Sequence, residues 1–227
     1  GHWMENRLMN RLSVVSWSGE SFADREEAGQ LLGEELKRRN FRISLVLGIP
    51  RGGAVVARVI AKVLDVEWDI VLAHKLAAPG NSELAIGAIG EGGTAWLNQQ
   101  IVGYVGADES YLRRETEQQK RELERRSKLI RSIRPRLPVK GRRVLVTDDG
   151  IATGATMIAA LQSVRTEQPE FLLAALPVGA EDSIARLEET ADEIICLRVP
   201  SFFQAVGQFY RQFDQVEDED LIRILKD

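Results

Sequence analysis

Cysteine is nearly absent: Cys196 is the single one among 227 residues, so no disulfide can form within the chain. Chains without disulfides are typical of a reducing compartment, and we expect a cytoplasmic protein. Cys196 lies in the apolar run 194–199. A buried, inert thiol is favoured there over a reactive one, because free cysteine usually behaves as a small core residue.

Long apolar runs are also missing. No stretch approaches the roughly 20 apolar residues that a membrane-spanning helix needs, and the first residues lack the apolar segment of a secretory signal. We therefore expect no membrane partner. Gly1–Trp3, before Met4, are interpreted as residues left from cloning and are excluded from the reasoning about the fold.

The chain has no excess of positive charge, since 30 Lys and Arg face 34 Asp and Glu, for a net charge of −4. A mildly acidic chain lacks the electrostatic signature of a nucleic-acid-binding protein. A polyanionic small ligand would need local positive charge or a metal ion. What remains, 44% hydrophobic and 28% charged residues, is typical of a globular protein with a substantial core.

Patterns typical of strands and helices alternate along most of the chain. Asp24 precedes a segment with acidic residues in its first turn and basic residues in its last, which matches a helix dipole. Strands are expected at 43–49, 68–73, 143–147, 171–177 and 193–199, and helices at 25–39, 54–64, 154–165 and 181–190. This rhythm predicts an α/β fold, with an open parallel sheet flanked by helices.

Two segments interrupt this rhythm. Residues 74–94 are rich in glycine and predict a long flexible loop with a hairpin, a kind of segment that is usually functional or disordered. Residues 108–133 predict a long charged helix. Its arginines could form a basic face for nucleic acid, but glutamates at helical spacing cancel their charge. We favour a solvated helix and expect no nucleic-acid partner.

The segment Val144–Thr156 carries the most informative pattern. An apolar strand delivers Asp148 and Asp149 to its carboxyl end, the edge of a parallel sheet where ligands bind. A glycine- and threonine-containing loop then opens a helix, whose free N–H groups suit phosphate. Phosphate donors beside two carboxylates suit a sugar phosphate. The alternative is an ordinary strand-to-helix turn with capping side chains.

This segment resembles the phosphoribosyl-pyrophosphate signature of the type I phosphoribosyltransferases: an apolar strand, two acids, three variable residues and Thr-Gly-x-Thr. The resemblance implies that Asp148 and Asp149 are catalytic acids that hold the ribose hydroxyls, directly or through water on Mg²⁺. It implies a 5′-phosphate loop made of Gly150, Ile151, Ala152, Thr153, Gly154, Ala155 and Thr156. Some purine-specific members have an aspartate where Ala152 stands, so no acid of this loop is expected to accept a proton.

Two further stretches fit the order of elements in that family. Gly48–Gly53 is similar to its pyrophosphate loop and offers Arg51, Gly52 and Gly53 as phosphate ligands, although alone it could be a plain turn. Lys75 resembles a basic residue that reaches pyrophosphate, and Glu83 is an acid of the flexible loop; both are expected to be catalytic. His74 is favoured as a structural donor over an acid or base.

The resemblance also suggests how the chain is organised. Residues 4–199 would form the phosphoribosyltransferase core, and residues 200–227 a C-terminal hood over the acceptor. Phe202 and Phe203 could stack a base there, or could simply pack within the protein. The segments 48–53, 79–93 and 200–207 look like a bacterial and archaeal group of unassigned acceptor. A homodimer is expected.

The function that these patterns favour is transfer of a phosphoribosyl group from 5-phosphoribosyl-1-pyrophosphate to a nitrogen acceptor, most simply a nucleobase. Pyrophosphate would leave, with Mg²⁺ as the cofactor. The alternative is a non-catalytic sensor of phosphoribosyl pyrophosphate or a nucleotide on the same fold. A sugar-phosphate hydrolase with Asp148 as nucleophile is a weaker hypothesis, because it leaves the Thr-Gly-x-Thr loop unexplained.

Overall fold

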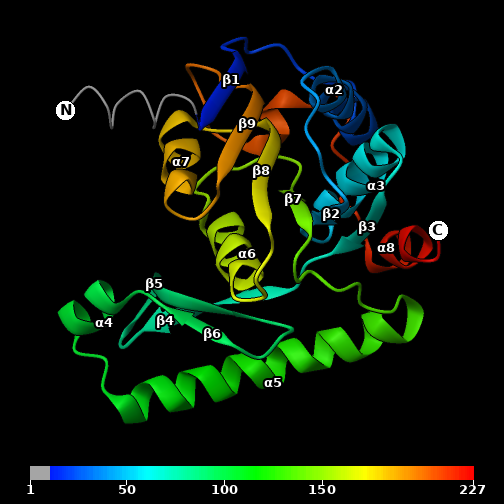
Figure 1. Cartoon of the computed structure of the whole chain (residues 1–227). Helices are drawn as coiled ribbons and strands as arrows, with labels where there is room; N and C mark the ends of the chain where they lie inside the picture. The colour runs from blue at the N-terminus through cyan, green and yellow to red at the C-terminus, as the bar shows by residue number, and fades with distance from the viewer. Residues whose placement is uncertain (1–10) are drawn as a thin grey trace.

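A six-stranded, fully parallel sheet forms the centre of the molecule (Figure 1). A computed structural model describes residues 11–227, so the interpretation of Gly1–Trp3 lies outside the described residues. The strand order is β1-β9-β8-β7-β2-β3. The strands are β1 (Leu12–Ser16), β9 (Glu193–Arg198), β8 (Phe171–Val178), β7 (Arg143–Thr147), β2 (Leu45–Gly48) and β3 (Glu67–Ile70). The predicted parallel α/β sheet is confirmed, and β1 is an added edge strand that was not predicted.

Helices cover both faces of this sheet, as Figure 1 shows. Successive strand residues point to opposite faces, so Leu145 packs in one core cluster while Val144 and Val146 pack in the other. One face carries α2 (Arg25–Arg38) and α3 (Gly52–Leu64), and the other carries α6 (Ala155–Arg165), α7 (Glu181–Arg186) and the 3-10 helix η1 (Leu187–Glu189). Because both faces are covered, the strands read as continuous apolar runs.

The predicted first helix is confirmed together with its N-terminal signal. The Asp24 side chain accepts a hydrogen bond of 2.8 Å from the backbone N–H of Glu27. Glu26 and Glu27 lie in the first turn of α2, and Lys37 and Arg38 lie in its last turn. Both charge groups stabilise the helix through its dipole.

The expected long loop is mostly regular structure. Residues 73–97 form a three-stranded antiparallel sheet of β4 (Ala73–Ala78), β5 (Asn81–Gly90) and β6 (Ala95–Leu97), with short connections at 79–80 and 91–94. Alanine and glycine favour strands weakly, so the sequence pattern indicated a loop. Packing overrides that preference, because Leu76, Ile86 and Ile89 are buried in a cluster of their own.

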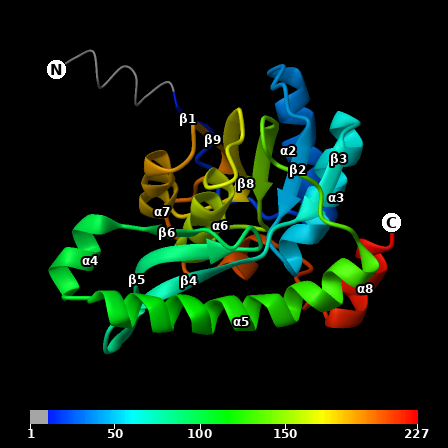
Figure 2. The ribbon, with the colours of Figure 1, turned by 60° about the horizontal axis from the view of Figure 1, so that its bottom comes forward.

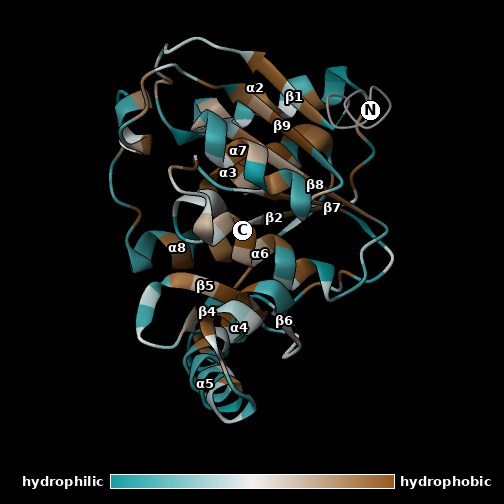
Figure 3. Cartoon of the chain, turned by 90° about the vertical axis from the view of Figure 1, so that its left-hand side faces the viewer, coloured by the Kyte–Doolittle hydropathy of each residue, from teal (hydrophilic) through white to brown (hydrophobic). Residues whose placement is uncertain are grey.

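This second sheet and helix α5 (Glu109–Ile133) form a separate layer below the core in Figure 1, which Figure 2 brings forward. A short helix, α4 (Gln99–Val105), joins them. The long helix was predicted correctly. Within α5 only Leu123 and Ile130 are buried, and Figure 3 shows it largely hydrophilic beside the hydrophobic central strands. Most of the helix surface is therefore exposed, as the solvated-helix interpretation requires.

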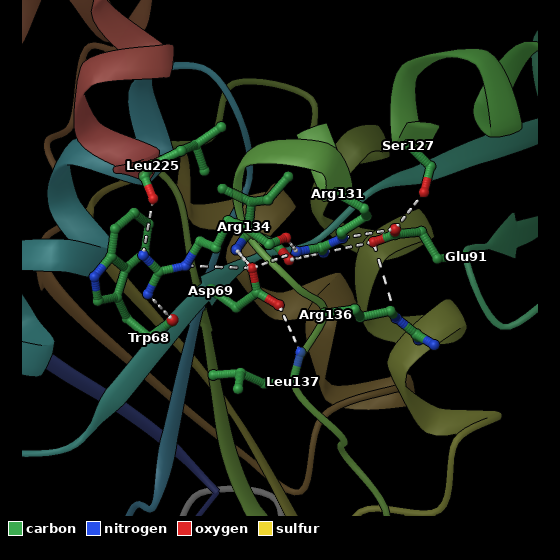
Figure 4. A network of polar contacts seen from close by, with 10 residues as sticks. Trp68, Asp69, Glu91, Ser127, Arg131, Arg134, Arg136, Leu137 and Leu225 are labelled. Carbon is green, nitrogen blue, oxygen red and sulfur yellow. Dashed lines mark hydrogen bonds and ion pairs between the residues drawn. The ribbon is translucent and has the colours of Figure 1, made fainter. Parts of the chain in front are cut away.

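A buried ionic network fastens the C-terminal part of α5 to the core (Figure 4). The Arg131 guanidinium donates to Asp69 Oδ1 on β3 at 2.7 Å and to Glu91 Oε1 after β5 at 2.7 Å. Ser127 also donates to Glu91, at 2.6 Å. Arg134 lies over the Trp68 ring, 4.0 Å from its centroid. The network thus joins the central sheet, the antiparallel sheet and α5.

The C-terminal segment runs back across the core. It contains the 3-10 helix η2 (Val206–Phe209) and α8 (Asp218–Leu225). Leu221 and Leu225 of α8 are buried in the same core cluster as α2 and α3. Among the described residues, no helix combines the length and the apolar character that crossing a membrane requires.

Candidate functional site

Two adjacent carboxylates stand where β7 ends. Asp148 and Asp149 directly follow Thr147, the last residue of β7. The backbone N–H of Asp149 donates to Asp148 Oδ1 at 2.8 Å. Burial raises the pKa of Asp148 well above its ordinary value, and the negative charge of Asp149 raises this pKa further. The pair is therefore poised to accept a cation or hydroxyl donors, either of which would relieve this penalty.

Two residues from distant parts of the sequence hold Asp149 in place. Arg25 Nε at the start of α2 donates to Asp149 Oδ2 at 3.0 Å, and its guanidinium lies 4.1 Å from the centroid of the Phe213 ring. The Tyr210 hydroxyl donates to the Asp149 carbonyl oxygen at 2.6 Å. Both residues lie far from Asp149 in the sequence, so no local pattern links either of them to it.

The glycine loop, residues 49–53 between β2 and the first turn of α3, lies directly against this acid pair. A Cβ atom added to Gly52 would lie 2.2 Å from Asp149 Oδ2, and one added to Gly53 would lie 3.0 Å from Asp148 Oδ1. Only glycine lets the backbone approach the carboxylates this closely. The two segments that resemble the pyrophosphate loop and the ribose-phosphate loop are therefore neighbours in space.

Arg51 belongs to the same loop but contacts the C-terminal helix. Its Nη1 lies 3.3 Å from Asp218 Oδ1, and the Asp218 side chain is 86% exposed. An exposed pair of this kind contributes little free energy, so the contact leaves Arg51 free to exchange partners.

The loop after the acid pair leads into α6 with its donors exposed. Gly154 has a φ of 82°, which glycine adopts without strain. Thr153, Ala155 and Thr156 are exposed at the start of the helix, where the first N–H groups lack intrahelical partners. The other loop residues anchor it: Gly150 packs against Val206 and Val178, Ile151 bridges to Gly179, and the Ala152 carbonyl accepts from Ser183.

A cavity of about 400 Å³ separates this helix start from the antiparallel sheet. Its lining includes Lys75 of β4, Gln119 of α5 and Thr156 of α6. The expected basic residue therefore lies across a hollow from the expected phosphate loop. Gln119 was not among the predicted site residues, because a glutamine on a charged helix carries no signal.

Glu83 does not join Lys75 in this structure. In the register of the hairpin, Lys75 lies opposite Ala88, five positions from Glu83 along β5. At roughly 3.3 Å per residue this is about 16 Å. Glu83 is exposed near the turn. The two predicted catalytic residues are thus on one hairpin but at different distances from its tip.

A smaller cavity of about 50 Å³ is lined by residues of the glycine loop, of the start of α6 and of α5. These residues include Ile49 and Pro50 of the glycine loop, Thr156 of α6 and Arg126 of α5. Arg126 was considered earlier only as part of a solvated face. The structure adds it to the surroundings of the site.

The two predicted base-binding aromatics have different surroundings. Phe203 packs on Phe209, with ring centroids 5.2 Å apart. Phe202 is 85% exposed. Phe203 therefore packs within the protein, and of these two residues only Phe202 presents an accessible ring.

The residues present suit a magnesium ion that is shared with a ligand. Within residues 11–227, no group of three or more His, Cys, Asp or Glu is arranged to hold a metal. Asp148 and Asp149 supply two carboxylates, and Mg²⁺ commonly combines one or two carboxylates with substrate phosphates and water. The buried negative charge at Asp148 would be stabilised by such an ion.

Comparison with known proteins identifies relatives across most of the chain. Residues 24–214 match the family model described as the phosphoribosyl transferase domain. Proteins named as phosphoribosyl transferases in two strains of Mycobacterium tuberculosis are 41% identical over 204 residues, which is 90% of this chain. The alignment covers 46% of those proteins, so the chain spans about half the length of the curated relatives it matches.

One solved structure is similar over nearly its whole length. The crystal structure of TT1426 from Thermus thermophilus shares 45% sequence identity and a TM-score of 0.86 with this chain. The match covers 91% of this chain and 98% of the other. The arrangement of the central sheet, the antiparallel sheet and the C-terminal segment is therefore similar to that of a second, experimentally solved protein.

Proposed function

We propose that this chain, which belongs to the phosphoribosyl transferase domain family, binds 5-phosphoribosyl-1-pyrophosphate with Mg²⁺ and transfers the phosphoribosyl group to a nitrogen acceptor. Pyrophosphate is the leaving group. The acceptor is most simply a nucleobase.

The contact between the glycine loop and the acid pair is the observation that carries this proposal. The pyrophosphate and the ribose hydroxyls of the donor are attached to neighbouring carbons of one small ring, so their binding elements must adjoin. Gly52 and Gly53 lie against Asp149 and Asp148 with no room for a side chain between them. A sugar bound at the carboxylates would thus present its diphosphate to the glycine N–H groups.

The remaining residues would bind the other charged groups of the donor. The exposed start of α6, with Thr153 and Thr156, offers N–H and hydroxyl donors to the 5′-phosphate. Arg51 would exchange its exposed partner Asp218 for a phosphate oxygen, where a guanidinium binds as a fork. Lys75 faces the same site across the cavity. Together they would stabilise negative charge that grows on the leaving pyrophosphate.

Asp148 and Asp149 would hold Mg²⁺, and the ion would supply further neutralisation of the pyrophosphate charge. Arg25 keeps Asp149 oriented for that role through its 3.0 Å hydrogen bond. Glu83 would reach the site only if the hairpin tip closes over the ligand. Such a closure would exclude water, which otherwise competes with the acceptor for the ribosyl group.

Pyrophosphate release tests this proposal. The chain is incubated with Mg²⁺ and phosphoribosyl pyrophosphate, and released pyrophosphate is measured with adenine, hypoxanthine, guanine, uracil and small amines in turn. We expect release that depends on one acceptor and disappears in Asp148→Asn. Binding of the donor without release from any acceptor would favour the sensor. Absence of donor binding would contradict the proposal.

A further inference from the structure

We propose that His74 is the general base of the transfer and that the 400 Å³ cavity beside it binds the acceptor, a small heteroaromatic ring with an N–H group. This inference rests on the proposed function. It starts from a chain of hydrogen bonds that joins β4 to α5. Gln119 Nε2 donates to Glu115 Oε1 at 2.9 Å, and Gln119 Oε1 lies 3.2 Å from His74 Nδ1.

The donors and acceptors in this series of hydrogen bonds determine which imidazole nitrogen carries the proton. An ionised carboxylate can only accept hydrogen bonds, so the amide nitrogen of Gln119 must face Glu115. The amide oxygen of Gln119 then faces His74 and can only accept. His74 Nδ1 must therefore be the N–H nitrogen. In the neutral ring the other nitrogen, Nε2, has a free lone pair and can accept a proton.

A cavity that His74 helps to line provides room for the acceptor. His74, Lys75 and Thr156 line it together, so its occupant lies between the imidazole and the proposed phosphate loop. Four alanines, Ala73, Ala77, Ala155 and Ala159, supply apolar walls. A volume of about 400 Å³ is within the usual range of small-ligand pockets. Small methyl walls around a few polar groups suit a flat, mostly uncharged ring.

The step needs a proton acceptor, because an N–H nitrogen that bonds to C1′ must lose its proton to become neutral. In the proposed step, the acceptor nitrogen forms a bond to C1′ while the bond from C1′ to the pyrophosphate oxygen breaks. The pyrophosphate keeps that electron pair. The proton of the acceptor nitrogen moves to His74 Nε2, and the imidazolium later releases it to water. Gln119 and Glu115 are positioning residues, because they fix the tautomer without touching the acceptor.

The tautomer can be measured directly, since the chain has only two histidines, His2 and His74. Nitrogen-15 NMR of the imidazole rings in the wild-type chain should show His74 protonated at Nδ1 and unprotonated at Nε2. In Gln119→Leu this single tautomer should be lost. Gln118→Leu, one position away on the exposed face of α5, should leave it unchanged. A His74 ring protonated at Nε2 in the wild type would overturn the inference.

Kinetics provide the second measurement, with Mg²⁺, phosphoribosyl pyrophosphate and adenine, hypoxanthine or uracil as acceptors. His74→Asn keeps a donor toward Gln119 but lacks the basic nitrogen. Its kcat should fall by about 100-fold or more, as for loss of a general base, with little change in KM for the donor.

The outcomes separate this inference from the proposed function. Unchanged kcat in His74→Asn, or donor binding with no release from any of these bases, would overturn the role of His74 and its cavity. Absence of donor binding in the wild-type chain would overturn the proposed function and this inference with it.

Discussion

Replacing Arg131 with methionine should cost far more stability than the same replacement of an exposed arginine on α5. Arg131 is 14% exposed and pairs with Asp69, 1% exposed, and Glu91, 6% exposed. It makes two contacts with Glu91, at 2.7 Å and 2.9 Å. Methionine would fill much of the same space while leaving two buried carboxylates without their main partner.

The size of the loss follows from what remains around those carboxylates. Asp69 keeps a 3.1 Å hydrogen bond from the Leu137 N–H, and Glu91 keeps a 2.6 Å hydrogen bond from Ser127. Removing one partner of a buried ion pair typically costs about 3–5 kcal/mol. Because both acids stay partly bonded, we expect a loss near the lower end, about 3 kcal/mol. The network would thus contribute a large share of a total stability of about 5–15 kcal/mol.

The assay is urea unfolding, followed by circular dichroism and tryptophan fluorescence. Arg125→Met, on the exposed face of the same helix, is the matched control and should change the free energy of unfolding by less than about 0.5 kcal/mol. Adding Glu91→Gln to Arg131→Met should recover part of the loss, because one buried charge disappears. A loss in Arg131→Met no larger than in the control would refute the reasoning.

The same variant should respond to pH. Burial raises the pKa of Glu91, but hydrogen bonds from Arg131 and Ser127 more than offset this and hold the pKa below its ordinary value. A lowered carboxyl pKa contributes stability above the unfolded-state pKa and loses it as pH falls through the folded-state pKa. Without Arg131, the main contribution that lowers the Glu91 pKa is lost, and burial would raise this pKa against the weaker effects of Ser127 and Arg136. The difference between wild type and variant should therefore shrink as pH falls from about 7 toward about 4.

Three further predictions use other parts of the molecule. The raised pKa of Asp148 means that stability falls as pH rises above the unfolded-state pKa. Asp148→Asn should therefore raise the melting temperature at about pH 7, and this gain should vanish in acid. A lowered melting temperature would contradict this. Burial raises the pKa of Cys196 to about 12, so a thiol reagent should react only after unfolding, and rapid native reaction would contradict the buried environment. Hydrogen exchange across 74–89 should slow near the turn at Pro79 and Gly80 when Mg²⁺ and phosphoribosyl pyrophosphate are added; unchanged exchange would remove the catalytic roles proposed for Lys75 and Glu83.

Local patterns were sufficient to predict the parts of the fold that local interactions determine. The cap at Asp24, the apolar strands and the loop from Asp148 to Thr156 depend on neighbouring residues and were read correctly. The antiparallel sheet was predicted as a loop, because the alanines and glycines at 73–90 have little preference for strands. Packing on α5 and α6 stabilises the strands instead. Leu12–Ser16 was missed as a short edge strand.

The surroundings of the acid pair depend on contacts between distant segments. Arg25 and Asp149 meet although they are 124 positions apart in the sequence, and Tyr210 of the C-terminal segment contacts the same residue. Gln119 and Arg126 enter the site because α5 crosses beside the two loops. A charged helix with sparse apolar positions gives no sign of which residues face a cavity. These residues required the tertiary structure.

Isothermal titration of Mg²⁺ and phosphoribosyl pyrophosphate tests the central claim most directly. The account predicts that the wild-type chain binds the donor and that Asp148→Asn with Asp149→Asn weakens binding by about 100-fold or more, since two charge-assisted interactions are lost. Glu117→Gln, an exposed acid of α5, should bind like the wild type, and circular dichroism should show all three chains folded. Equal affinity in the double variant and the wild type would contradict the assignment of this acid pair as the ribose and magnesium site.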